Sequence, residues 1–129
     1  GHGLVELYRQ VSGDFDGDVE AAWIQQAADD GNATAASALR MFVSVYGACC
    51  ANLAVMMRPS GGIFIAGGIA EKILPWMQQA EFTGAYLNKG RMTPLVQSTP
   101  VYLVKNASVG LHGAVSYAAM LQHESESCQ

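Results

Sequence analysis

Helical spacing of apolar residues dominates the first half of the chain. Residues 4–11 carry apolar side chains three and four positions apart, and Gly13 closes the segment. A second short helix is predicted over residues 18–29. The longest helical stretch, residues 34–58, contains neither proline nor acidic residue, and Pro59 ends it. The pattern therefore predicts two short helices followed by one long helix.

The long helix is apolar on nearly every face from Met41 to Met57, apart from Ser44 and Asn52. This run is slightly shorter than the ~20 residues that a bilayer requires. We therefore favour a helix buried on all sides within a protein over a membrane span. Small residues such as Gly47 would let neighbouring helices approach closely. Asn52 is expected to be a core amide bonded to backbone or neighbouring groups, and the alternative is that it lines a site.

The second half of the chain alternates short apolar runs with helical segments. Residues 62–68, "GIFIAGG", predict a buried strand of the parallel-sheet type. Residues 69–79 are amphipathic, and Pro75 should kink or restart that helix. Residues 100–105, "PVYLVK", predict a second strand. Together they predict one right-handed β–α–β crossover, and hence a helix-rich α/β fold.

The end of the chain predicts a last helix of small residues, "LHGAVSYAAMLQ", and a polar, frayed tail over residues 123–129. Residues 1–122 are then one domain. Two strands do not make a stable sheet alone, so we expect further strands elsewhere. The chain opens without an initiator methionine, and we expect it to enter a larger protein partway.

Composition narrows the class of protein. Half of the residues are apolar and 14% are charged, which is typical of a globular domain. Seven scattered Lys and Arg and a net charge of −4 argue against a nucleic-acid or membrane surface. No signal-peptide pattern is present, so a reduced, cytoplasmic setting is expected. Cys49 and Cys50 are adjacent, point about 100° apart on a helix, and are predicted to be free, buried thiols.

Alternating acids in the first turn region suggest a calcium loop. Asp14, Asp16 and Asp18 occupy alternate positions, but the sixth and twelfth positions of an EF-hand loop hold Val19 and Gln25 instead of Gly and Glu. We interpret these acids as residues of a helix start, where they favour the macrodipole.

Two adjacent glycines, Gly67 and Gly68, end the first predicted strand. The dinucleotide-binding spacing G-x-G-x-x-G is absent, and Glu71 in the first helical turn would repel phosphate. Two interpretations are left. Either the strand end and helix start form a flat backbone surface for a nucleoside, which we favour, or the glycines only allow a tight turn.

The ordered motifs resemble the C-terminal part of the bacterial glucokinases, in the sugar-kinase, actin and Hsp70 superfamily. They are Asn52-Leu53-Ala54 in the long helix, "GGIFIAGGIAEKILP", "KGRM", "PVYLV" and Gly-Leu-x-Gly-Ala, and they span nearly the whole chain. The resemblance implies the C-terminal lobe portion of an actin-like ATPase (ribonuclease H-like) fold. It also implies an enzyme that transfers the γ-phosphate of ATP to the 6-hydroxyl of glucose, at the entry to glycolysis.

The resemblance also implies roles for particular residues. Residues 62–70 match the adenosine motif, so Gly67, Gly68 and Ile69 are expected to contact the nucleotide. Gly110 and Gly113 match the segment that packs back between the two lobes, where they allow close helix approach at a hinge or simple helix packing.

Three basic residues near these motifs are weaker candidates for phosphate binding or catalysis. Lys89 and Arg91 are possible phosphate ligands, and for Arg91 we favour a surface ion pair or a carbonyl cap. His112 replaces a residue that is usually apolar in the family motif, so no catalytic role is expected for it.

The resemblance places the chemistry elsewhere in the enzyme. In the family, an N-terminal Asp-Gly-Thr type loop, an Asn-Asp pair and a Glu/His cluster hold phosphate, Mg²⁺ and sugar, and none of them is found here. We therefore expect no catalytic residue in this chain, which would act with ATP, Mg²⁺ and glucose as part of a homodimeric enzyme. The alternative is a non-catalytic regulatory or assembly module with a sugar-kinase-like fold.

Overall fold

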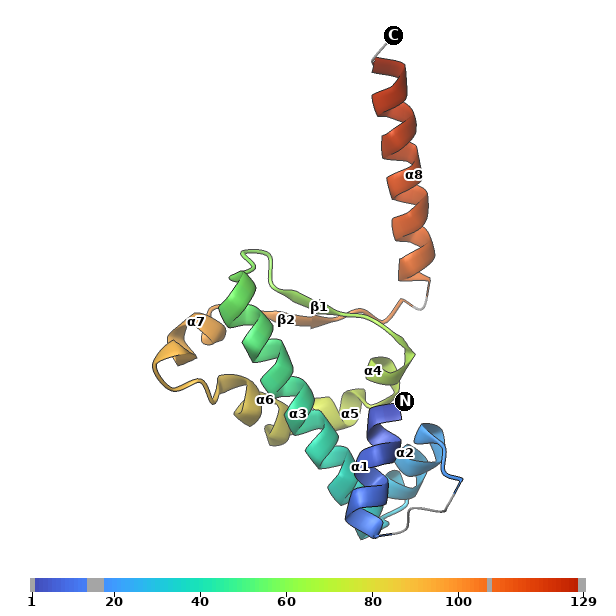
Figure 1. The fold of residues 1–129 in the computed structure, drawn as a ribbon, viewed down its shortest axis with the longest axis vertical. Coiled ribbons are helices and arrows are strands. Elements are labelled where there is room, and N and C mark those ends of the chain that lie inside the picture. Colours follow the sequence, from blue (N-terminus) through green and yellow to red (C-terminus); the bar gives the residue numbers. More distant parts are fainter. Residues whose placement is uncertain (1, 14–17, 107, 128–129) are drawn as a thin grey trace.

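The fold is helix-rich, with one small sheet (Figure 1). The computed structural model describes residues 2–13, 18–106 and 108–127. The elements in chain order are α1 (His2–Ser12), α2 (Ala21–Asp29), α3 (Ala33–Met57), β1 (Ile63–Ile65), α4 (Gly68–Lys72), α5 (Leu74–Met77), α6 (Ala80–Leu87), η1 (Gly90–Met92), α7 (Thr93–Gln97), β2 (Val101–Leu103) and α8 (Val109–Ser127).

The long helix α3 is the central element. Asn32 caps its start, because its Oδ1 accepts a hydrogen bond from the Ala35 amide at 3.0 Å. Arg58 ends it in the left-handed conformation, with φ 44°, directly before Pro59, which disfavours helical backbone in the preceding residue. By length and composition α3 could cross a membrane. In the structure it packs against α1, α2 and α6, which confirms the predicted long helix.

The predicted burial of α3 on all sides is wrong. One face lies in the core, whereas the described part of the chain leaves the opposite face uncovered. The buried residues are Ala35, Ala38, Leu39, Val43, Gly47, Cys50, Ala51 and Ala54. The exposed apolar residues are Met41, Val45, Leu53, Met56 and Met57.

The prediction that Asn52 is a core amide is also wrong. Asn52 is exposed, and its Oδ1 accepts a hydrogen bond from Lys89 Nζ at 2.6 Å. These two residues line a surface hollow together with Val55, Met56 and Met92.

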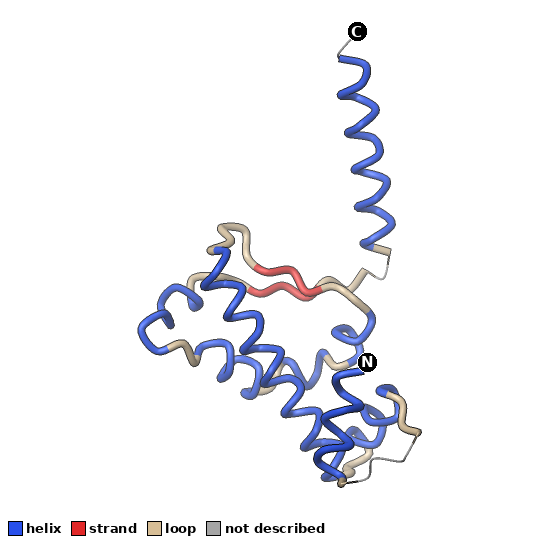
Figure 2. Tube along the Cα trace, viewed as in Figure 1, coloured by secondary structure: helices blue, strands red, loops and turns tan. Residues whose placement is uncertain are grey.

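The strands β1 and β2 pair in parallel, with Ile63 opposite Val101 and Ile65 opposite Leu103 (Figure 2). This confirms the predicted β–α–β connection. The expectation of a fully buried first strand is wrong, because Ile65 faces the core while Phe64 is 65% exposed. Phe64 stacks on Tyr102 of β2, with ring centroids 5.0 Å apart. The described chain therefore covers one face of the sheet only.

Of two smaller predictions, one is confirmed and the other is wrong in its starting residue. The helix expected over residues 69–79 does restart at Pro75, which stands in the first turn of α5 after α4 ends at Lys72. The second helix begins at Ala21, later than expected, and its cap residue Glu20 makes no side-chain cap. Of the alternating acids, Asp14 and Asp16 lie outside the described residues.

Helix α8 stands away from the rest of the structure (Figure 1), and residues 108–122 are exposed. It continues to Ser127, and the frayed polar tail over residues 123–129 stays a prediction. The core lies instead where α1, α2 and α3 meet the helices of the crossover. Its largest fully buried side chains are Leu4, Ile24, Leu39, Val43, Ile73 and Val96.

Gly47 allows the close contact between α3 and α6, as its sequence context suggested. A Cβ at this position would overlap the backbone carbonyl of Phe82. Gly47→Ala is therefore expected to lower the free energy of unfolding by about 1–3 kcal/mol, measured by urea denaturation. Gly84→Ala is the matched control on α6, because its Cβ would meet nothing within 4 Å. Equal losses in both variants would contradict the close-contact account.

The two adjacent cysteines differ in exposure, which corrects the prediction that both are buried. Cys49 is exposed and Cys50 is buried. Burial raises the pKa of the Cys50 thiol, and the neighbouring Cys49 raises it further. At any pH below this raised pKa, a smaller fraction of Cys50 is in the reactive thiolate form than for a thiol with the ordinary pKa.

We expect a thiol reagent to label Cys49 rapidly and Cys50 only on unfolding. The measurement is stopped-flow labelling of a Cys128→Ser variant, which leaves these two thiols alone to react. Cys49→Ser and Cys50→Ser variants assign the two phases. Two fast phases in the folded protein would show that the buried face of α3 is open to solvent.

Candidate functional site

A cavity of about 490 Å³ opens where the carboxyl ends of β1 and β2 meet. Because the strands are parallel, the segments that follow them emerge at the same edge of the sheet. Ligands of α/β sheets bind at this edge. The residues that line the cavity are Ala66, Gly67, Gly68, Glu71, Val104, Asn106, Val109 and Gly110.

The β1 side of this cavity is bare backbone. Gly67 has φ 124° and ψ 154°, a conformation that is essentially restricted to glycine. Gly68 begins α4, and a Cβ built on either glycine meets nothing within 4 Å. The two glycines therefore leave a surface to which a planar group can approach closely, and only Gly67 is also required by the turn.

The β2 side of the cavity carries a polar side chain held in a fixed orientation. Asn106 Oδ1 accepts a hydrogen bond from the Ser108 amide at 2.9 Å, and its Nδ2 lies 3.3 Å from His112 Nδ1. An amide nitrogen can only donate, so His112 Nδ1 is the acceptor in this contact. His112 thus orients Asn106 at the start of α8.

Glu71 is the only charged side chain among the described residues that line this cavity. A carboxylate accepts hydrogen bonds from hydroxyl or amino donors and repels phosphate oxygens. The cavity is therefore chemically suited to the hydroxyl-bearing part of a ligand and unsuited to a phosphate group.

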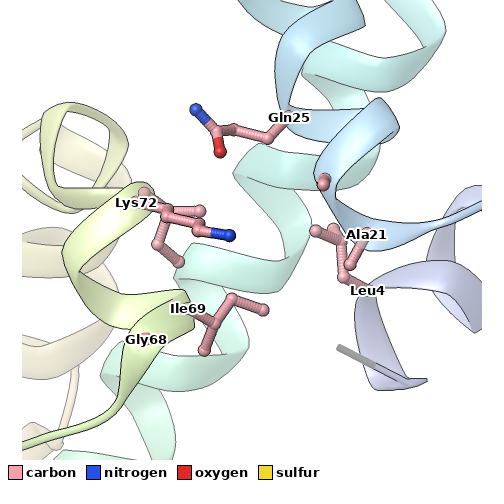
Figure 3. A pocket seen from close by; sticks show the side chains of 8 residues that line it. Leu4, Ala21, Gln25, Gly68, Ile69 and Lys72 are labelled. Carbon is pink, nitrogen blue, oxygen red and sulfur yellow. The ribbon is translucent and has the colours of Figure 1, made fainter. Parts of the chain in front are cut away.

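A second, smaller cavity of about 200 Å³ lies between α4 and the α1–α2 pair. Figure 3 shows Ile69 and Lys72 of α4 facing Leu4 of α1 and the α2 residues Ala21 and Gln25. The full lining is Leu4, Ala21, Ala22, Gln25, Gly68, Ile69, Lys72 and Ile73. Gly68 is shared with the first cavity, so the two cavities adjoin at the start of α4.

The structure brings together three of the five residues predicted for the site. Gly67, Gly68 and Gly110 all line the larger cavity. Ile69 is partly buried and lines the smaller one. Gly113 lines neither, and a Cβ there would meet nothing within 4 Å.

Lys89 and Arg91 line neither cavity at the start of α4. Lys89 is bonded to Asn52 on α3, and Arg91 lies exposed in η1. The structure therefore does not support either residue as a phosphate ligand at the glycine pair.

Sequence reasoning missed Asn106 and Gln25 as lining residues and considered Glu71 only for its repulsion of phosphate. Asn106 could have been found, because it follows the second strand as Gly67 follows the first, and parallel pairing places both at one edge. Gln25 carries no such signal, since it reaches the site from a helix more than forty residues earlier in the chain.

The described residues do not fit a metal site. No group of three His, Cys, Asp or Glu side chains converges among them. A divalent cation at this edge would need oxygen ligands beyond Glu71.

Comparison with known proteins identifies the family. The sequence profile of the family described as "Glucokinase" matches residues 1–121. The chain is 49% identical over 83 residues to the glucokinase of Nostoc punctiforme, covering 64% of this chain and 24% of that protein. It is 41% identical over 120 residues to a Nostoc sp. glucokinase, covering 92% of this chain and 35% of that protein.

A third relative aligns over a similar length. The glucokinase of Photorhabdus laumondii is 36% identical over 121 residues, covering 91% of this chain and 38% of that protein. The chain thus spans little more than a third of the length of these relatives. Since the family profile matches nearly all of it, the chain belongs to the glucokinase family.

Proposed function

We propose that the chain is the C-terminal part of an ATP-dependent glucokinase and supplies the wall against which adenosine binds. One observation carries this proposal: the bare backbone of Gly67 and Gly68 forms one side of a cavity at the carboxyl ends of the paired strands. The family match over residues 1–121 supports the reaction class.

The complete enzyme would transfer the γ-phosphate of ATP to the 6-hydroxyl of glucose in the cytoplasm. That reaction needs a carboxylate to accept the hydroxyl proton and Mg²⁺ to neutralise the phosphate charge. Glu71 is unsuited to both tasks, because it lines the nucleoside cavity and belongs to no group of three metal-ligating side chains among the described residues. We assign the general base, the metal ligands and the sugar contacts to the remaining part of the enzyme.

Within that enzyme the described residues bind and orient the nucleoside. Gly67 and Gly68 give close backbone contact, and Ile69 extends the wall into the smaller cavity. Asn106 offers a fixed amide from the opposite side. Positioning of this kind lowers the barrier to phosphoryl transfer without any proton transfer by these residues.

The exposed helix α8 fits a role between the lobes of an actin-like fold. It carries several exposed large apolar side chains: Val109, Leu111, Val115, Tyr117, Met120 and Leu121. An apolar surface of this kind favours a covering partner. In the complete enzyme the other lobe would cover it, and Gly110 and Gly113 would permit close approach at the hinge. We also propose that the enzyme is a homodimer.

The rival function is a non-catalytic regulatory or assembly module with a sugar-kinase-like fold. It would keep the adenosine wall and lack turnover. The gene that encodes the chain distinguishes the two, since a catalytic enzyme also requires the Asp-Gly-Thr type loop and the Asn-Asp pair.

The adenosine wall can be tested with Gly68→Val in the full-length enzyme. A Cβ at this position meets nothing within 4 Å, so the fold should persist. The branched group would occupy the nucleoside position, and KM for ATP should rise at least about tenfold, equivalent to a loss of about 1.4 kcal/mol. KM for glucose should change little.

The matched control is Gly84→Val, on α6 away from both cavities and also without neighbours within 4 Å. Its ATP kinetics should equal those of the unchanged enzyme. Unaltered KM for ATP in a folded Gly68→Val enzyme would refute the adenosine wall.

The assignment of the catalytic residues to the remaining part of the enzyme can be tested with the 129-residue chain alone. A coupled assay should detect no glucose phosphorylation, since general-base catalysis and charge stabilisation each contribute orders of magnitude and have no residue here. Adding the separately purified N-terminal part should restore activity. Turnover by the chain alone, as a monodisperse monomer in light scattering, would place the catalytic base within it.

A further inference from the structure

A long-range hydrogen bond connects α2 to the short helix α5. Trp76 Nε1 donates to Asp29 Oδ1 at 2.8 Å, between residues 47 positions apart. The Trp76 ring is buried, and Asp29 is the last residue of α2. A carboxylate at a helix C-terminus opposes the helix macrodipole. The bond to Trp76 offsets this effect, because a hydrogen bond to an ionised acceptor is stronger than one between neutral groups.

Further contacts hold both partners of this bond. Asp29 Oδ2 accepts a hydrogen bond from Gln25 Nε2 at 3.1 Å. Arg40 of α3 lies over the Trp76 ring, with its Cζ 5.8 Å from the ring centroid, which is a cation–π distance. Arg40 Nε lies 3.6 Å from Glu81 Oε1 of α6. Trp76 is therefore held along its edge by α2 and across its face by α3.

The position of α5 is passed directly to α4. Ile73 ends α4 and begins α5, with no loop between the two helices. Its amide donates to the Ile69 carbonyl at 3.0 Å, and its carbonyl accepts from the Met77 amide at 3.0 Å. The Ile73 side chain is fully buried. A shift of α5 would therefore move α4, which begins at Gly68.

Neither of these helices is long enough to hold its position alone. Helix α4 has five residues and α5 has four, and isolated helices of this length are not stable in water. Helix α4 packs mainly on α5, and α5 packs on α3 and α6. The bond from Trp76 to Asp29 adds the link to α2, which faces α4 across the smaller cavity (Figure 3). This bond therefore fixes the spacing between α4 and α2.

We propose that Trp76 and Asp29 are positioning residues, whose hydrogen bond holds α4 and the glycine wall, Gly67 and Gly68, where the nucleotide meets them. The inference rests on the proposed function, which assigns that wall to adenosine. Neither side chain lines a cavity at the start of α4, so both act through the backbone. A displaced wall loses its close contact with the nucleotide, and small misplacements of a bound substrate slow the reaction.

The test measures KM and kcat of the full-length enzyme that contains this chain. Trp76→Phe keeps an aromatic ring beneath Arg40 and removes the donor, whereas Asp29→Ala removes the acceptor. We expect each variant to raise KM for ATP about 3- to 10-fold, as for the loss of one hydrogen bond, with KM for glucose unchanged. The double variant should raise KM for ATP no further, because both substitutions remove the same bond.

A loss of stability alone would give a different result. Partial unfolding lowers the concentration of active enzyme and hence the apparent kcat, whereas the folded fraction keeps its KM. Tyr86→Phe is the control for stability, because it removes another buried hydrogen bond of 2.8 Å, from the Tyr86 hydroxyl to the Thr99 carbonyl. Tyr86 lines neither cavity at the start of α4. This variant should lower Tm and leave KM for ATP unchanged.

Two further variants control for the charge of Asp29. Asp29→Asn keeps an oxygen that can accept from Trp76, so its KM for ATP should stay close to that of the unchanged enzyme. Asp30→Ala is the matched control on the next residue. Asp30 also lies at the end of α2, where its carboxylate accepts from Gln26 of the same helix at 3.3 Å. Its removal should leave KM for ATP unchanged.

Asp29→Ala decides the outcome, because Asp29 is exposed and its truncation leaves no hole in the core. An unchanged KM for ATP in this variant would overturn the positioning role, and so would an equal rise in Tyr86→Phe or Asp30→Ala. Gly68→Val separates this result from the proposed function. If Gly68→Val alone raises KM for ATP, the adenosine wall stands without the positioning bond. If neither Gly68→Val nor Asp29→Ala raises it, both proposals fail.

Discussion

The parallel pairing of β1 with β2 is the constraint on which the candidate site depends. It is bounded by two backbone hydrogen bonds, from the Ile63 amide to the Pro100 carbonyl at 2.9 Å and from the Val104 amide to the Ile65 carbonyl at 2.8 Å. Gly62 makes the first of these approaches possible. Its φ is 93°, and any Cβ there would collide with Pro100 and the Tyr102 ring.

Because the pairing is parallel, the residues after both strands reach the same edge. The segment after β1 contributes bare glycine backbone, and the segment after β2 contributes a fixed asparagine amide. The glycine wall thus lets a ligand approach the backbone closely, and the asparagine amide fixes the direction of a hydrogen bond to that ligand. The same start of α4 also borders the smaller, largely apolar cavity.

Much of the fold could be predicted because local signals agree with the final structure. Asn32, Pro59, Pro75 and Gly13 each mark a helix end or restart through their own backbone or side-chain chemistry. Burial was less predictable. An apolar helix such as α3 and an apolar strand such as β1 read as buried on all sides, yet the covering of a face depends on which other residues are present. The exposed Met56 and Phe64 show this limit.

The site, like the fold, could be predicted only where its signals are local in the sequence. The glycine pair is a local feature and could be recognised from sequence, whereas Gln25 and Asn106 reach the cavities through tertiary contacts. The orientation of Gln25 depends on Asp29 and, through it, on Trp76 of another helix. The Trp76–Asp29 hydrogen bond joins residues 47 positions apart, and a contact of this kind leaves no periodic pattern in the sequence.

The most direct test of the central claim is an NMR titration of the ¹⁵N-labelled chain with ADP. If the nucleoside lies at the start of α4, the backbone amides of Gly67 and Gly68 should shift together and saturate with one affinity. Shifts confined to the apolar hollow beneath the sheet, which Leu74, Phe82 and Tyr86 line, would contradict the claim. So would a spectrum that does not change at saturating ADP.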